Sequence, residues 1–139
     1  MGGATVLHAS SLPLPKNVVG IIADCPYSSP EEIIKKVCSD MGFPVSITMP
    51  FVKLGAWLFG GFKLQGGAVS SVKECKVPIL ICHGEADDFV PVQMAREIFE
   101  ACASEKYLFT VPNAGHGISF IEDPVGYKQT LNCFLLKIL

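Results

Sequence analysis

Two residues suited to proton transfer follow predicted strands in this chain. Asp87 lies in the string H-G-x-x-D-x-x-V-P after the apolar run 77–84, and His116 stands between two glycines after a second apolar run, 107–111. Short apolar runs of this kind are typical of buried strands, and open α/β sheets gather their site residues beyond the carboxyl ends of parallel strands. A carboxylate fixes the tautomer of a neighbouring imidazole and stabilises its cation. The two residues therefore predict a site beyond the strand ends that is suited to acid–base chemistry.

Other readings of these residue types stay open. Asp87 could instead brace the loop or cap the helix that begins near Pro91, and Asp88 would be the functional acid if the loop were shifted by one residue. We expect His83 to support the loop through a hydrogen bond, and His8 to be a surface or packing residue. No H-x-x-x-H or C-x-x-C pair is present, so neither a metal nor a cofactor is predicted.

The first residues could be the remnant of a sharp catalytic turn. Met1-Gly2-Gly3 runs into a helical pattern over residues 4–10. In a G-x-S-x-G nucleophile elbow, the glycine two positions after the serine allows the turn to close. Gly2 would be that glycine, and Met1 would follow a serine that this sequence does not contain. The alternative is a flexible N-terminus.

Taken in chain order, these motifs resemble the C-terminal half of the α/β-hydrolase family, of the esterase or prolyl oligopeptidase-like type, beginning just after the nucleophile serine. The resemblance implies an α/β fold with a small parallel sheet of about three strands, near residues 18–23, 78–82 and 107–111, flanked by helices. It also implies that Asp87 is the triad acid, that His116 is the triad base, and that the backbone nitrogen of Met1 is an oxyanion donor.

Two classes of function follow from the resemblance. The first is a serine hydrolase that cleaves carboxylic ester or peptide bonds of a small acyl substrate when intact, with this chain alone at most a feeble enzyme. The second is an inactive fragment or pseudo-hydrolase that acts in association or in apolar ligand binding. No serine of the chain precedes the glycine that an elbow requires, so we expect no surrogate nucleophile among the serines considered, which are Ser10, Ser11, Ser28, Ser29 and Ser119.

The segment 42–67 differs from the rest of the chain. It combines glycines with five large aromatic residues and only two charged residues, Lys53 and Lys63. The two lysines and the repeated glycines argue against a membrane span, whereas an interfacial helix stays open. The resemblance implies a cap over the substrate, with an acyl-binding surface formed by Phe51, Trp57, Phe59 and Phe62. Packing of these side chains on the core is the alternative, and residues 66–72 are expected to form a turn and linker.

The composition predicts one cytoplasmic domain over residues 1–139. Half of the residues are hydrophobic, 17% are charged and the net charge is -2, so no nucleic-acid partner is expected. The six cysteines lack close pairing and no cleavable signal is evident, which indicates reduced thiols. In the family's strand order, the apolar strand 18–23 loses its neighbour. This unpaired edge predicts a homo-oligomer.

Overall fold

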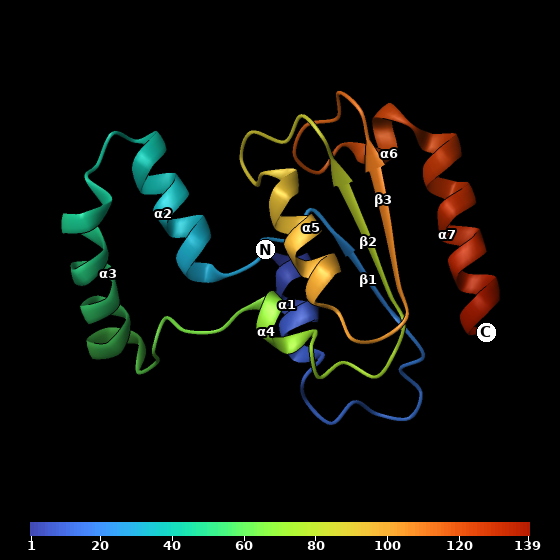
Figure 1. The fold of residues 1–139 in the computed structure, drawn as a ribbon, viewed down its shortest axis with the longest axis horizontal. Coiled ribbons are helices and arrows are strands. Elements are labelled where there is room, and N and C mark those ends of the chain that lie inside the picture. Colours follow the sequence, from blue (N-terminus) through green and yellow to red (C-terminus); the bar gives the residue numbers. More distant parts are fainter.

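The computed structural model describes all 139 residues as a three-stranded parallel sheet with helices on both faces (Figure 1). The expected α/β class is confirmed. The sheet order is β1-β2-β3, which is also the order along the chain. The elements are α1 (Gly2–Ala9), β1 (Ile21–Asp24), α2 (Pro30–Asp40), α3 (Val45–Gly60), α4 (Ala68–Ser71), β2 (Ile79–Gly84), α5 (Val92–Ala101), β3 (Lys106–Val111), α6 (Ser119–Glu122) and α7 (Pro124–Ile138).

The central strand β2 is buried along its whole length. Successive side chains of a strand point to opposite faces, and this alternation divides β2 between two cores. Ile79 and Ile81 join the larger core with α1, α4 and α5, while Leu80 and Cys82 pack with Phe134 of α7. The apolar run in the sequence therefore encodes a strand covered on both faces.

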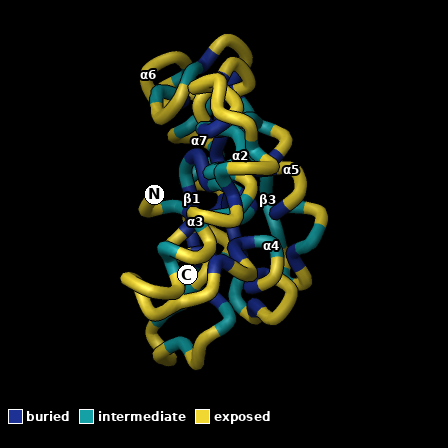
Figure 2. The backbone as a smooth tube through the Cα atoms, turned by 90° about the vertical axis from the view of Figure 1, so that its left-hand side faces the viewer, coloured by how far each residue is buried: buried dark blue, intermediate teal, exposed yellow.

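The helices form two layers that enclose the sheet. Figure 1 shows α1, α4 and α5 on one face and α7 on the other, in agreement with the contacts of α5 with β2 and of α7 with β3. In Figure 2 the buried segments gather along the strands, whereas much of α3 is exposed. The sheet thus holds the ends of β2 and β3 rigidly side by side.

The α2 and α3 helices form a hairpin that projects away from the sheet (Figure 1). The Ser29 hydroxyl accepts a hydrogen bond from the Glu32 N–H at 3.1 Å, so Ser29 caps the start of α2. Lys53 of α3 forms an ion pair with Glu31 of α2 at 2.9 Å. The expected cap segment 42–67 is largely the helix α3. None of the helices combines the length and the apolar character that a membrane span requires.

Two expectations about elements need correction. Residues 66–72 are not only a turn and linker, because Ala68–Ser71 form the short helix α4 and Ala68 and Val72 enter the main core. The first strand begins at Ile21, because the chain is still in an irregular loop at Val18. The prediction that this strand lies at an edge of the sheet is correct.

Candidate active site

Asp87 and His116 meet at the carboxyl edge of the sheet. Asp87 lies in the loop after β2, and His116 lies in the loop after β3. His116 Nδ1 is 2.7 Å from Asp87 Oδ2, although the two residues are 29 positions apart in the sequence. Asp88 is exposed and has no such contact, so Asp87 is the carboxylate that pairs with the imidazole.

Asp87 is held rigidly by its own loop. Its Oδ1 accepts hydrogen bonds from the backbone N–H of Phe89 at 3.0 Å and of Val90 at 2.7 Å. This turn is the loop-bracing role weighed for Asp87, and it occupies one oxygen while the other meets His116. His83 is fully buried and its Nε2 lies 2.8 Å from the Val90 carbonyl oxygen, as expected for a residue that supports the loop.

Backbone contacts hold the two site loops together. The N–H of Glu85 donates to the Val111 carbonyl at 2.9 Å, and the N–H of Ala86 donates to the Ala114 carbonyl at 3.0 Å. A Cβ atom at Gly84 would collide with the carbonyl of Ala114, so only glycine allows this close approach. Glycine is therefore needed in the H-G motif so that the loop after β2 can pack against the loop that carries His116.

The geometry leaves one nitrogen of His116 available. An ionised carboxylate can only accept a hydrogen bond, so the contact with Asp87 assigns the proton to Nδ1. Nε2 then carries a lone pair and has no partner in the protein. The side chain is 39% exposed, and the ring of Phe89 packs against it edge-on with centroids 5.2 Å apart. The arrangement can accept a proton from a group that approaches Nε2.

Cys25 ties the end of β1 to the histidine loop. Its Sγ accepts a hydrogen bond from the Gly117 N–H at 3.3 Å, and its own N–H donates to the Cys82 carbonyl at 2.9 Å. Its φ of 46° is rare for a residue other than glycine. Burial raises the pKa of the Cys25 thiol to about 11, so the thiol is neutral and unreactive near neutral pH.

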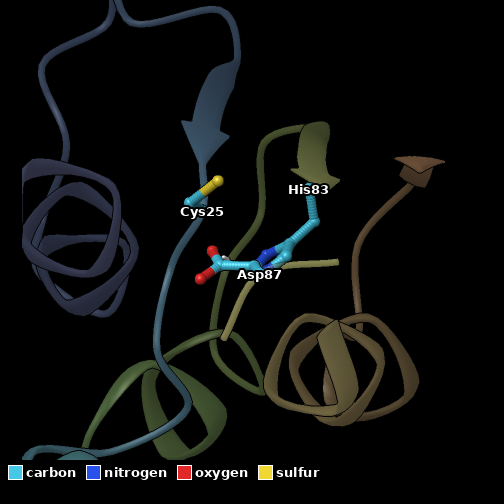
Figure 3. A group of neighbouring side chains, drawn as sticks. All are labelled: Cys25, His83 and Asp87. Atoms are coloured by element: carbon cyan, nitrogen blue, oxygen red, sulfur yellow. Dashed lines mark ion pairs between the residues drawn. The ribbon is translucent and has the colours of Figure 1, made fainter. Parts of the chain in front are cut away.

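Cys25, His83 and Asp87 form a buried group whose ligand-type atoms lie within 4.8 Å of one another (Figure 3). A metal ion there would have to displace the hydrogen bonds that His83 and Asp87 already make to the loop. It would also need the Cys25 thiolate, which burial disfavours. The group therefore serves the loop architecture, and its present hydrogen bonds do not fit a metal centre.

The start of α1 lies against the carboxyl end of β1. A Cβ atom at Gly3 would lie 2.6 Å from the carbonyl oxygen of Asp24, so glycine is required for this approach. Gly2, by contrast, has open space around its Cα, and Met1 is 90% exposed. Gly3 and Cys25 thus connect the start of α1 and the end of β1 to the site, and the motif analysis did not identify either role.

The other candidate residues lie apart from this pair. No serine hydroxyl hydrogen-bonds to His116, and Ser119 is fully buried without a partner for its hydroxyl. His8 Nδ1 is 2.8 Å from the Ser71 hydroxyl oxygen, consistent with a packing role. The structure does not bring the aromatic residues of the expected acyl-binding surface to His116, and it leaves their side chains exposed on α3 and just after it; they are Phe51, Trp57, Phe59 and Phe62.

Solved structures with a similar fold include a lipase and an esterase. A monoacylglycerol lipase from Paleococcus ferrophilus aligns with a TM-score of 0.68 and 17% identity, over 99% of this chain and 65% of that chain. An esterase from Pyrococcus furiosus aligns with a TM-score of 0.69 and 19% identity, over 98% of this chain and 50% of that chain. The chain has part of the α/β-hydrolase fold.

Sequence comparisons match the chain to one family model and to one curated protein, and a further solved structure has a similar fold. Residues 67–134 match the family of the PhoPQ-activated pathogenicity-related protein. The uncharacterized protein YqkD of Bacillus subtilis is 23% identical over 137 residues, which cover 97% of this chain and 45% of that protein. The acylaminoacyl peptidase of Pyrococcus horikoshii is similar over 23% of its length, with a TM-score of 0.65 and 17% identity. The chain thus spans only part of the length of these proteins.

Proposed function

We propose that residues 1–139 carry the acid and base of a serine hydrolase that cleaves carboxylic ester or peptide bonds. The observation that carries the proposal is the 2.7 Å contact between Asp87 and His116, with Nε2 free to accept a proton. In this role His116 takes the proton of an attacking serine hydroxyl and then delivers it to the leaving group, while Asp87 orients the ring and stabilises its cation.

The nucleophile in this proposal precedes Met1. Support comes from the close packing of Gly3 on Asp24 and from the hydrogen bond between Cys25 and Gly117, because these contacts connect the start of α1 to the histidine loop. A serine just before Met1 would occupy the elbow between a strand and α1. The Met1 N–H would then help to stabilise the oxyanion, and Gly2 would close the turn.

The apolar surface of α3, together with Phe62 just after it, is the proposed binding element for the acyl group. Phe51, Trp57 and Phe59 are 70%, 58% and 91% exposed, and Phe62 is 56% exposed. Exposed apolar surface of this extent marks a binding function in soluble proteins. Because α3 packs mainly on α2, the hairpin must move toward the sheet to cover a substrate held at His116.

Fluorophosphonate labelling, read by peptide mass spectrometry, tests this proposal. We expect no adduct on the 139-residue chain, and an adduct on a serine preceding Met1 when the chain is extended by its upstream reading frame. The adduct should disappear in His116→Ala and persist in His8→Ala, which changes a histidine outside the site. An adduct within residues 1–139 that depends on His116 would identify a surrogate nucleophile instead.

An inactive protein that acts by association is the second candidate. The observation that favours it is the open edge of β1, which lacks a neighbouring strand and has Val19 and Ile22 exposed beside it. In this alternative the segment 18–23 pairs with a second copy of the chain. Absence of any adduct in the extended protein, together with stable self-association, would favour it over the hydrolase.

A further inference from the structure

A second concave site lies at the opposite end of the sheet from Asp87 and His116. It is a groove of about 870 Å³ between the loop that follows α1 and the loop that follows α4. Val18 precedes β1 and Val77 precedes β2, so the groove lies at the amino ends of the strands. Its volume is that of small-molecule sites in proteins.

The charges that line this groove are unbalanced. Lys16, Lys73 and Lys76 line it together with one carboxylate, Glu74, and no ion pair joins them. Every other lysine except Lys63 has a carboxylate, hydrogen-bond or aromatic partner. The groove therefore concentrates positive charge in a chain whose net charge is -2.

The backbone carbonyl groups near these lysines accept hydrogen bonds from other donors. The carbonyl of Leu7 at the end of α1 accepts from Ser10, and the carbonyl of His8 accepts from the Ser11 hydroxyl. At the end of α4, the Val72 carbonyl accepts from the N–H groups of Cys75 and Ala103. The side-chain hydrogen bonds of lysine in this structure involve other lysines, so the ammonium groups of Lys16, Lys73 and Lys76 remain available to a ligand.

Residues 12–15 form an apolar and stiff part of the groove wall, next to Ser10 and Ser11. Pro13 and Pro15 fix the backbone of the loop, while Leu12 and Leu14 provide aliphatic surface. Leu12 is 64% exposed, whereas Leu14 also packs on the main core. A ligand that satisfies both walls must combine an apolar body with a negative head.

We propose that this groove binds an amphiphilic organic anion, in which an alkyl or acyl chain carries a phosphate or carboxylate head. The head contacts the three lysines, and the chain lies on the Leu12 to Pro15 wall. The site is independent of the proposed hydrolase chemistry, because it shares no residue with the Asp87 and His116 loops.

NMR titration of the labelled 139-residue chain with dodecyl phosphate, below its micelle concentration, tests the proposal. Backbone amide and methyl signals are the suitable readout, because Trp57 lies on α3 and its fluorescence would report a different surface. We expect saturable shifts that centre on Leu12, Leu14 and Val18. Dodecanoate should compete if the head-group site accepts carboxylates, whereas inorganic phosphate alone should bind much more weakly.

Matched variants distinguish recognition of the charged head from nonspecific apolar binding. Replacing Lys16, Lys73 and Lys76 together by Gln should weaken binding by about tenfold or more, since each lost contact removes a charged hydrogen bond. Lys63→Gln removes an unpartnered lysine outside the groove and should leave binding unchanged. Leu12→Ser changes an exposed side chain and should also weaken binding. Each variant is checked for an unchanged amide spectrum.

Three results would overturn the proposal. Shifts that centre on α3 would show that the alkyl chain binds the exposed aromatic surface instead. Equal affinity for uncharged dodecyl glucoside, or for the variant without the three lysines, would show that the lysines do not recognise the head. Equal affinity for inorganic phosphate would reduce the groove to a simple anion site.

Discussion

Asp87 accepts hydrogen bonds from two backbone N–H groups as well as facing His116. One side chain therefore shapes the loop after β2 and orients the imidazole. The loop hydrogen bonds and the contact with His116 use different oxygens of the carboxylate, so substitutions can remove one without the other. Asparagine keeps a carbonyl oxygen for the loop, whereas alanine removes both acceptors.

Asp87→Ala should lower the free energy of unfolding by about 3 kcal/mol, because it leaves the buried N–H of Val90 and the N–H of Phe89 without acceptors. Asp87→Asn should cost clearly less and still leave His116 without a carboxylate partner. Urea denaturation of both variants checks this expectation. Equal losses in the two variants would show that the backbone hydrogen bonds do not stabilise the loop.

The Cys25 thiol links stability to alkaline pH. Burial raises its pKa from 9.0 to about 11, so the folded state keeps a proton that the unfolded state loses. The stability contributed by this thiol is fully present below pH 9 and is lost as the pH rises through 11. Cys25→Ser keeps an acceptor for Gly117 without a titrating thiol. Its urea midpoint should fall less steeply between pH 9 and 10.5 than that of the unchanged chain.

Cys82, whose pKa burial raises to about 12, contributes in the same direction in both proteins. Parallel curves would contradict the assignment to Cys25.

At the scale of elements, the position of α1 depends on a glycine that faces β1. Gly3→Ala should destabilise the fold by about 2 kcal/mol, since a Cβ there meets the carbonyl of Asp24 and overpacking typically costs this much. Gly2→Ala is the matched control. It faces open space in the same helix and should be neutral or stabilising by up to about 1 kcal/mol, because alanine favours helix. Thermal denaturation distinguishes the two, and equal effects would contradict the packing of α1 on β1.

The strands and the meeting of Asp87 with His116 could be predicted from the sequence because their signals are local. The apolar run before His83 and the glycines around His116 mark strand ends within a few residues. The roles of Gly3 and Cys25 depend on which elements approach each other in space, and no local pattern encodes that approach. The α4 helix was missed for a related reason, since four residues carry too little periodicity and Ala68 is helical only where the core buries it.

At the scale of the whole molecule, the open edge of β1 predicts self-association. Ile22, which is 39% exposed, lies on this strand. We expect the chain to sediment as a dimer at micromolar concentration and Ile22→Lys to shift it toward monomer, because charge on an edge strand opposes pairing.

Phe59→Lys is the control for this prediction, because Phe59 is 91% exposed on α3 and far from the edge in sequence. Dissociation caused by Phe59→Lys alone would assign the interface to α3. A chain that sediments as a monomer throughout would contradict association by either surface.

The pairing of β2 with both neighbours also sets an order of folding. Ile79 pairs with Lys106 on one side and with Ile21 on the other, and the second pairing closes a loop about twice as long. Loop closure costs more entropy as the loop lengthens, and distant pairings slow folding. The β2-α5-β3 unit is thus expected to form before β1 docks. Until then the apolar edge of β2 is unpaired. Two newly made chains that meet at this stage can therefore form a domain-swapped dimer, in which β1 of each chain pairs with β2 of the other.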